Sequence, residues 1–334
     1  MLDAGLRERG VDLMTLPDGI PEAQLADAVR DADLLLMCYT PVTARVIEAA
    51  ARLKGIVKYG VGIDAIDIAA ARQRRIPVVN IPEYAEETVA EGAFALMIAV
   101  AKKLRGLGRA MDSAGWAWPT PRWLANDLAG KTLGLVGVGR IGRSMARMAG
   151  AGFRMRVLGF DPHVGEASMQ AAGVEKREDL NAMLAECDYV SLHCTLNPAT
   201  RHILGEAQIA CLKRAAVVVN SSRGALIDEP ALVRALVEGR IGGAGLDVFS
   251  QEPLALEGHP LSPLFAMENV ILTPHLTFYT QEAMDRLERE ALERCDELLE
   301  GRPVRVKSHD PRLRAQEHGV VFEDSPIPPQ GERA

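Results

Sequence analysis

The chain has 334 residues, of which 48% are hydrophobic and 25% are charged, an ordinary composition for a globular protein with room for two domains. Its formal net charge of −7 at pH 7 argues against a nucleic-acid partner. No apolar segment is long enough to span a membrane, and the first residues lack the hydrophobic region of a secretory signal.

Strand-like and helix-like segments alternate in the first part of the chain. Apolar runs of strand length occupy residues 11–16, 34–37, 54–61 and 77–81. Helical patterns occupy residues 1–10, 21–31, 43–50 and 65–74. This alternation is typical of a parallel α/β sheet.

Residues 88–104 are apolar around most of a helix circumference, with Glu91 as an interruption. A helix that is apolar on nearly all sides is buried on all sides, so we expect a helix between two domains. Trp116, Trp118 and Trp123 follow among glycines and prolines, which favours packing or subunit contacts over cofactor stacking.

A glycine-rich turn follows a short apolar strand expected at residues 132–136. Gly137, Gly139 and Gly142 have the spacing G-x-G-x-x-G and precede a helical segment. The first glycine permits a tight turn, the second lets a pyrophosphate approach the backbone, and the third permits close packing of helix and strand. The helix N-terminus offers free N–H groups to the phosphates. This context predicts a dinucleotide site.

Asp161 supplies a second signal. It ends the strand expected at residues 156–160, roughly 20 residues after the last glycine. A carboxylate here accepts hydrogen bonds from ribose hydroxyls and repels the 2′-phosphate of NADP, so we expect NAD as the cofactor. The alternative interpretation is a helix cap or a turn residue.

Further strands are expected at residues 189–192, 216–220, 243–247 and 270–272, which completes six strands of a doubly wound dinucleotide domain. A long amphipathic helix at residues 281–300 then returns the chain to the first unit. We predict an α/β fold of two doubly wound parallel-sheet domains. A Rossmann NAD-binding domain, residues 91–276, is inserted into a discontinuous, flavodoxin-like substrate domain, residues 1–90 and 277–334. Residues 306–334 are expected to form either a packed arm or a disordered tail.

Four polar residues that suit hydride transfer follow the later strands: Arg223, Asp247, Glu252 and His275. Ligands of doubly wound sheets lie beyond the carboxyl ends of the strands. A ketone reduced by hydride needs a proton from a group of the histidine type, and His275 is the candidate for this role. Glu252 would orient this imidazole, Arg223 would hold a carboxylate and a carbonyl, and Asp247 would accept from the nicotinamide amide. Each residue alone would also fit a loop or surface position, and their shared placement favours the catalytic interpretation.

The five cysteines are scattered and odd in number, without a C-x-x-C pair or a His/Cys cluster. We expect free thiols, a reducing cytoplasm and no bound metal.

Over roughly residues 11–306 the chain resembles the D-isomer-specific 2-hydroxyacid dehydrogenases. The motifs that carry the resemblance are Gly60-Val61-Gly62-Ile63-Asp64, Thr88-Val89-Ala90-Glu91, Gly137 to Gly142 with Asp161, Asn220-Ser221-Ser222-Arg223-Gly224, Leu246-Asp247-Val248-Phe249 with Glu252-Pro253, and Thr273-Pro274-His275. The resemblance implies an NAD-dependent oxidoreductase that interconverts D-2-hydroxy acids and 2-keto acids. It implies the catalytic set Arg223, Glu252 and His275, with His275 as acid/base.

The resemblance also implies binding residues and a partner. The residues that would contact NAD are Gly137, Gly139, Arg140, Ile141, Gly142, Asp161, Cys194, Thr195, Ser221, Ser222 and Asp247. Backbone N–H groups near Val61 and Gly62 would hold the substrate carboxylate, together with Arg223, and Tyr84 would touch the substrate. A homodimer formed mainly through the nucleotide domains is implied as well.

Two segments, Pro82-Glu83-Tyr84 and Phe278-Tyr279-Thr280, resemble the D-lactate dehydrogenase and C-terminal-binding-protein branches of the family. The second branch supplies an alternative function, an NAD(H)-sensing regulatory protein that keeps the same catalytic residues. Lys58 departs from the arginine of many members, which bears on the substrate pocket.

Overall fold

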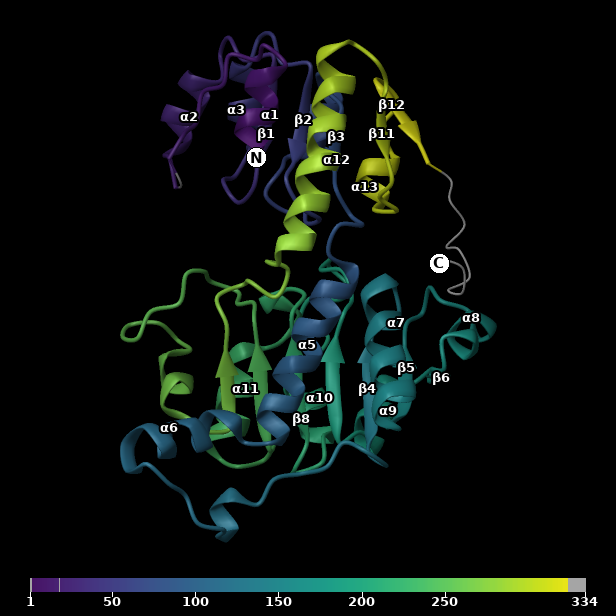
Figure 1. Cartoon of the computed structure of the whole chain (residues 1–334). Helices are drawn as coiled ribbons and strands as arrows, with labels where there is room; N and C mark the ends of the chain where they lie inside the picture. The colour runs from purple at the N-terminus through teal and green to yellow at the C-terminus, as the bar shows by residue number, and fades with distance from the viewer. Residues whose placement is uncertain (1, 18, 324–334) are drawn as a thin grey trace. The chain divides into compact units, whose positions relative to one another are not determined.

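The computed structural model describes residues 2–17 and 19–323. The chain divides into two compact units, Met1–Ala85 with Thr280–Ala334, and Glu86–Tyr279 (Figure 1). The predicted NAD-binding domain, residues 91–276, lies within the second of these spans. The boundaries of the NAD-binding domain, residues 91 and 276, remain a prediction.

The larger unit contains a seven-stranded parallel sheet in the order β10-β9-β8-β7-β4-β5-β6. Its strands are β4 (Thr132–Val136), β5 (Arg156–Phe160), β6 (Glu175–Lys176), β7 (Tyr189–Leu192), β8 (Val217–Asn220), β9 (Gly243–Leu246) and β10 (Val270–Leu272). The chain starts in the middle at β4, runs to one edge, and returns to the other side through β7, which confirms the doubly wound topology. Strand β6 was not predicted, because its two residues are too few to show a recognisable alternation.

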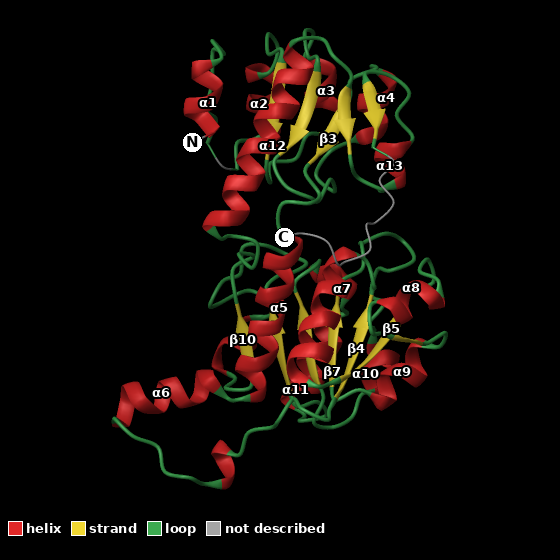
Figure 2. Ribbon diagram, turned by 45° about the vertical axis from the view of Figure 1, so that its right-hand side comes forward, coloured by secondary structure: helices red, strands yellow, loops and turns green. Residues whose placement is uncertain are grey.

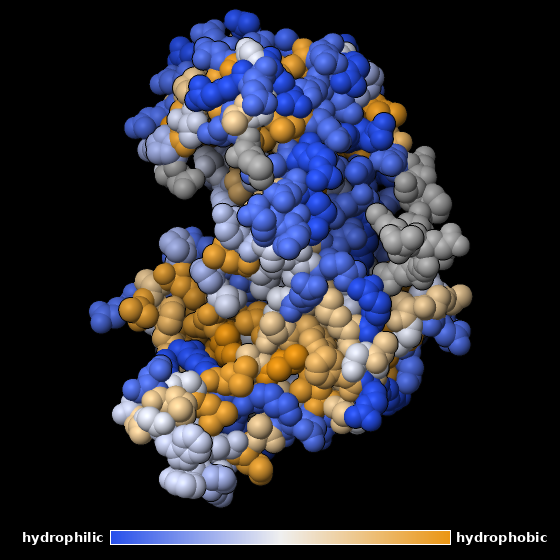
Figure 3. All heavy atoms as spheres, in the orientation of Figure 1, coloured by the Kyte–Doolittle hydropathy of each residue, from blue (hydrophilic) through white to orange (hydrophobic). Residues whose placement is uncertain are grey.

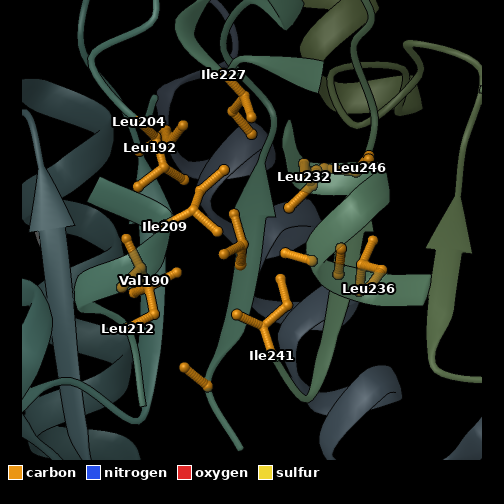
Figure 4. Packing of buried hydrophobic residues seen from close by; sticks show 14 of the residues in the cluster. Val190, Leu192, Leu204, Ile209, Leu212, Ile227, Leu232, Leu236, Ile241 and Leu246 are labelled. Carbon is orange, nitrogen blue, oxygen red and sulfur yellow. The ribbon is translucent and has the colours of Figure 1, made fainter. Parts of the chain in front are cut away.

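Helices cover both faces of this sheet (Figures 1 and 2). They are α5 (Glu86–Ala101), α7 (Arg140–Arg147), α8 (Glu166–Ala171), α9 (Leu180–Glu186), α10 (Glu206–Cys211) and α11 (Glu229–Val237). Helix α6 (Leu104–Ala114) follows α5, extends away from the sheet and is mostly exposed. Alternate residues of each strand point to opposite faces. Thus Val217 and Val219 of β8 join the core beneath α5 and α7, while Val218 joins the core beneath α9, α10 and α11. Figure 4 shows part of the second core.

Helix α5 matches the expected apolar helix, with one correction. Half of its 16 residues are buried, but Glu87, Glu91 and Ala95 are exposed, so the helix is not buried on every side. Alanines count as apolar in the sequence pattern, yet a methyl group tolerates solvent at little cost. On the buried side, Leu96 packs against Gly245 of β9, where a side chain would overlap the helix.

The smaller unit contains a three-stranded parallel sheet, β1 (Leu34–Met37), β2 (Gly55–Lys58) and β3 (Val78–Asn80), and a two-stranded pair, β11 (Val304–Val306) and β12 (Val320–Phe322). Its helices are α1 (Leu2–Glu8), α2 (Glu22–Ala28), α3 (Ala44–Ala49), α4 (Ile68–Gln73), α12 (Gln281–Leu299) and α13 (Pro311–Arg314). Leu298 of α12 packs against Gly55 of β2. The long C-terminal helix therefore belongs to the first unit, as predicted.

Residues 11–16 and the C-terminal arm differ in how well they match the predictions for this unit. The predicted strand at residues 11–16 does not form, although Val11, Leu13 and Leu16 pack against the core as half-buried side chains. Alternating hydrophobicity specifies which side chains are buried, whereas a strand also needs a neighbour with which to exchange backbone hydrogen bonds. Residues 306–323 form a packed arm with α13 and β12, and the remainder of the predicted tail lies outside the described residues. Within the described ranges, no helix combines the length and apolarity that crossing a membrane requires.

Candidate active site

The loops at the carboxyl ends of the larger sheet hold the catalytic candidates and the residues expected to contact NAD. Residues 137–142 follow β4, Asp161 follows β5, Cys194 and Thr195 follow β7, Ser221, Ser222 and Arg223 follow β8, Asp247 and Glu252 follow β9, and His275 follows β10. Because the strands are parallel, these loops share one edge of the sheet, where doubly wound folds bind ligands.

His275 and Glu252 form a direct pair. The Nδ1 atom of His275 lies 3.0 Å from Oε2 of Glu252, and the other carboxylate oxygen accepts a hydrogen bond of 2.9 Å from the N–H of Phe249. Burial by itself would raise the pKa of Glu252. The hydrogen bonds from His275 and Phe249, with the positive charges of His275 and Arg223, outweigh it and hold this pKa below its ordinary value. The carboxylate therefore stays ionised at neutral pH and fixes one nitrogen of the imidazole.

Asp247 organises the loop that carries His275. This aspartate is fully buried, and its two oxygens accept from the hydroxyls of Thr273 and Thr277 at 2.6 and 2.7 Å. They also accept from the N–H groups of Leu276 and Thr277, both at 3.0 Å. His275 stands among these residues with a left-handed φ of 58°, which is uncommon for a side chain other than glycine. The four hydrogen bonds hold the backbone in this conformation.

From the sequence, Asp247 was expected only to contact nicotinamide, and the roles of Thr273 and Thr277 were not expected. The signal was present in part, since both threonines flank His275 in the sequence. The sequence did not identify Asp247 as their hydrogen-bond acceptor, because it lies 26 and 30 residues away from the two threonines.

Arg223 is held by its own loop and by a close backbone approach. The side chain of Asn220 donates to the carbonyl of Arg223 at 2.9 Å, and Nη1 of Arg223 donates to the carbonyl of Ser222 at 2.7 Å. The next residue, Gly224, lies so close to the backbone of Phe249 that a Cβ atom there would overlap it. The Arg223 loop and the Glu252 loop are thereby pressed together, which brings the three catalytic candidates to one place.

The glycine-rich turn fits a dinucleotide. Gly137 has a φ of 95°, and a Cβ atom there would collide with the backbone of Cys194. A Cβ atom on Gly142 would collide with the carbonyl of Gly137, whereas one on Gly139 would meet nothing within 4 Å. The first and third glycines therefore close the turn, and the second faces open space at the start of α7, where free N–H groups are available for phosphate.

Asp161 supports this turn from the neighbouring strand. Its carboxylate accepts from the N–H of Val138 and from the N–H of His163, each at 2.9 Å. Each oxygen retains a further lone pair for a ribose hydroxyl. Arg140 is paired with Glu86 at 3.1 Å, and Ile141 packs half-buried against the core beneath α5 and α7.

The loops after β7 and β8 are joined by a hydrogen bond of 2.8 Å from the Ser222 hydroxyl to the carbonyl of Cys194. Burial raises the pKa of the Cys194 thiol to about 12, so this side chain is a neutral packing group. The buried hydroxyl of Ser221 has no hydrogen-bond partner among the described residues, which is what a ligand-binding group shows in the absence of ligand. Thr195 is exposed, and its carbonyl accepts from Thr200 at 2.6 Å.

The remaining substrate candidates follow β2 and β3 of the smaller sheet. Val61 is 45% exposed, and its carbonyl accepts from Asn80 at 2.6 Å, with Gly62 next to it. Tyr84 is buried, and its carbonyl accepts from Arg286 at 2.7 Å. These residues belong to the smaller unit, whereas Arg223, Glu252 and His275 belong to the larger unit.

Lys58 ends β2 in the same region and is almost fully buried. Its ammonium group donates to the carbonyl of Cys38 and lies 5.2 Å from the centre of the Tyr39 ring. These partners of Lys58 are not apparent from the sequence. A buried cation therefore stands close to the predicted substrate residues of this unit. Among the residues that the structure describes, no group of three or more His, Cys, Asp or Glu side chains could hold a metal.

Residues 94–277 match the family described as "D-isomer specific 2-hydroxyacid dehydrogenase, NAD binding domain". This chain belongs to the D-isomer specific 2-hydroxyacid dehydrogenase family. The match confirms the predicted family, and the matched residues lie within the larger unit.

Similar proteins and a similar crystal structure support the same family assignment. The chain is 42% identical over 266 residues to the glyoxylate reductase of Korarchaeum cryptofilum, covering 79% of this chain and 78% of that protein. It is 39% identical over 284 residues to the D-3-phosphoglycerate dehydrogenase of Methanocaldococcus jannaschii, covering 85% of this chain but only 53% of that protein. The chain thus spans about half the length of that relative. The crystal structure of D-lactate dehydrogenase from Aquifex aeolicus, complexed with NAD and lactic acid, has a TM-score of 0.78 and 28% identity, over 90% of this chain and 91% of that one.

Proposed function

We propose that this protein is an NAD-dependent D-2-hydroxyacid dehydrogenase, an oxidoreductase that acts on CH–OH donors and reduces a 2-keto acid in the reverse direction. The observation that carries the proposal is the 3.0 Å pair of His275 and Glu252 beside Arg223, at the edge of an NAD-binding sheet. The larger unit would be the NAD-binding domain and the smaller unit the substrate domain.

The protein's own groups would orient the substrate and move the proton. When bound, NADH supplies a hydride to the carbonyl carbon of the keto acid. The guanidinium of Arg223 would hold the carbonyl oxygen and the carboxylate through its forked donors. His275, in its protonated imidazolium form, would donate a proton from Nε2 to the developing alkoxide. Glu252 would accept a hydrogen bond from the Nδ1–H of His275 and so stabilise the imidazolium before the proton is transferred. In the oxidative direction, His275 would take the proton back.

The cofactor would rest on the turn at residues 137–142, with Arg140 and Ile141 at its phosphates and Asp161 at the adenosine ribose. Cys194, Thr195, Ser221, Ser222 and Asp247 would complete the site. Asp161 is the reason for proposing NAD over NADP, because its carboxylate would repel a 2′-phosphate. The unpartnered hydroxyl of Ser221 supports a polar ligand at this position.

The substrate would be a small 2-keto acid, as the names of the relatives suggest. Its carboxylate would bind the backbone N–H groups near Val61 and Gly62, and Tyr84 would contact its side chain. The buried ammonium of Lys58 supports an anionic substrate at this end of the smaller sheet.

We further propose a homodimer in the cytoplasm. Exposed apolar residues gather on α6 and the segment after it: Leu104, Met111, Trp116, Trp118 and Leu124 are each between 47% and 75% exposed. Figure 3 shows apolar residues gathered over the larger unit on one face, whereas hydrophilic residues dominate the smaller unit.

All five cysteines are free, which suits a reducing compartment such as the cytoplasm.

A panel of 2-keto acids with NADH, followed at the absorbance of the cofactor, tests the proposal. Glyoxylate, pyruvate, hydroxypyruvate, phosphonooxypyruvate and branched or aromatic keto acids belong in it. Fast turnover of at least one is expected. Slow turnover of all of them, with tight NADH binding that changes affinity for a protein partner, would instead favour the NAD(H)-sensing alternative.

A further inference from the structure

A cavity of about 390 Å³ lies in the smaller unit, between the end of α4 and the segment that follows α13. This volume is in the range of small-molecule sites. Ile76, which lines it, lies two residues before Val78, the first residue of β3, so the cavity lies at the amino end of this strand. Val61, Gly62 and Tyr84 follow the carboxyl ends, at the opposite edge of the same sheet. The cavity is therefore separate from the proposed substrate residues.

Two arginines and a histidine line this cavity without structural partners. Arg74, at the end of α4, donates to the carbonyls of Ile47 and Ala50 and so has a packing role. Its neighbours Arg72 and Arg75 are exposed, and neither side chain makes a hydrogen bond or an ion pair with any residue that the structure describes; the same is true of His318. Unpaired guanidinium groups that converge on a concave surface are suited to carboxylate and phosphate oxygens.

The charge of the lining is positive, because Glu317 is the one carboxylate among the described residues that line the cavity. Its single negative charge leaves an excess of one positive charge against Arg72 and Arg75, before any contribution from His318. A single negative charge would neutralise this excess, and an oxyanion with a second negative charge would also match His318 in its charged form.

The segment that carries His318 is anchored to the smaller sheet through Gln316. Gln316 is 5% exposed, and its side-chain amide accepts from the N–H of Val78 at 2.7 Å and donates to the carbonyl of Val78 at 2.9 Å. This two-point contact fixes the segment after α13 to β3. The three basic groups are thus presented from two anchored elements, which limits the entropy lost when a ligand binds.

We propose that this cavity is a binding site for a multivalent oxyanion, either a phosphate group or a small polycarboxylate, held by Arg72, Arg75 and His318. The site is distinct from the reaction centre, and its occupancy ties the end of α4 to the segment after α13. It rests on the lining residues alone and does not depend on the proposed reaction.

Isothermal titration calorimetry of the full chain with inorganic phosphate and, separately, with citrate tests the proposal at constant ionic strength. The test variant is R72A/R75N, in which asparagine is chosen because residue 75 has a φ of 56° and asparagine tolerates this conformation. The matched control is R7A/R154N. Arg7 lies on α1, Arg154 has the same φ of 56°, and both are exposed without a side-chain partner among the described residues.

One-site binding of phosphate or citrate is expected for the wild type and for R7A/R154N, and binding at least tenfold weaker for R72A/R75N. The tighter of the two ligands identifies the source, a phosphate compound or a polycarboxylate. Reduction of a keto acid without added anion should be equal in all three proteins. H318Q supplies an independent variant and should also weaken binding. Equal affinity in wild type and R72A/R75N, or no binding of either ligand to the wild type at millimolar concentration, would overturn the proposal.

Discussion

The backbone of Gly224 lies against the backbone of Phe249 with no room for a side chain between them. Gly224 directly follows Arg223, and the N–H of Phe249 donates to Glu252. A single glycine therefore sets the separation of the loops that carry the guanidinium and the carboxylate of the proposed catalytic group.

We expect G224A to push these two loops apart. A methyl group forced against backbone atoms destabilises a well-packed site by about 1–3 kcal/mol, so both the melting temperature and the rate of keto-acid reduction should fall. G108A is the control, because residue 108 lies in the interior of α6 with nothing within 4 Å of a Cβ atom. Alanine should there be neutral or stabilising by up to about 1 kcal/mol. Full activity of G224A would show that the spacing of these loops is unimportant.

Loss of the His275 imidazole should remove the proton donor and leave the cofactor site intact. We expect H275N to lower kcat by about 10²–10⁴-fold with little change in NADH affinity, measured by fluorescence titration. Asparagine tolerates the left-handed backbone at this position. H202N is matched to it, since His202 has a φ of 53° and lies outside the proposed site. Wild-type turnover of H275N would exclude His275 as the acid/base.

Replacement of Asp247 by asparagine should loosen the loop of His275. An amide has one acceptor oxygen in place of two, so at least one backbone N–H, of Leu276 or Thr277, loses its acceptor. A buried donor without an acceptor costs about 1–3 kcal/mol, and kcat should fall along with stability.

A second variant separates this effect from a contact with nicotinamide. T277V removes one hydroxyl that donates to Asp247. If Asp247 acts through the loop, the effects of D247N and T277V on kcat should be strongly non-additive. A D247N protein with weakened NADH affinity, normal stability and additive effects would point to the cofactor contact alone.

The stability of the protein should depend on pH through His193. This residue follows β7, and one ring nitrogen lies 2.9 Å from the hydroxyl of Ser191. Burial lowers the pKa of His193 from 6.5 to about 4. Between these values the unfolded chain binds a proton that the folded protein does not, so the contribution of this residue to stability is complete above pH 6.5 and is lost as the pH falls toward 4.

We therefore expect the wild type to lose more stability than H193Q between pH 7 and pH 4, by up to about 3 kcal/mol. Urea unfolding at a series of pH values measures this difference. H163Q, which removes an exposed imidazole, should retain the wild-type dependence. Parallel curves for the wild type and H193Q would contradict the prediction.

The strands of the larger sheet and the glycine-rich turn were predictable because their signals are local. β4 and β5 begin and end at the predicted residues, since each is a short apolar run bounded by polar residues and turn formers. The order of chemistry-bearing residues after successive strands was also readable, because parallel topology brings carboxyl ends to one edge. By contrast, the alternation at residues 11–16 predicted a strand where only the burial pattern of its side chains is present.

Contacts between residues distant in the chain required the tertiary structure. The four hydrogen bonds to Asp247, the approach of Gly224 to Phe249, and the position of Lys58 beside the Tyr39 ring each join residues separated by about 20 to 30 positions. Residue type alone gives no information on such pairs, because their distance depends on how neighbouring loops pack after the sheet has formed. The amino-acid pattern thus specifies the strands and the identity of the reactive groups, and packing among the loops specifies their mutual geometry.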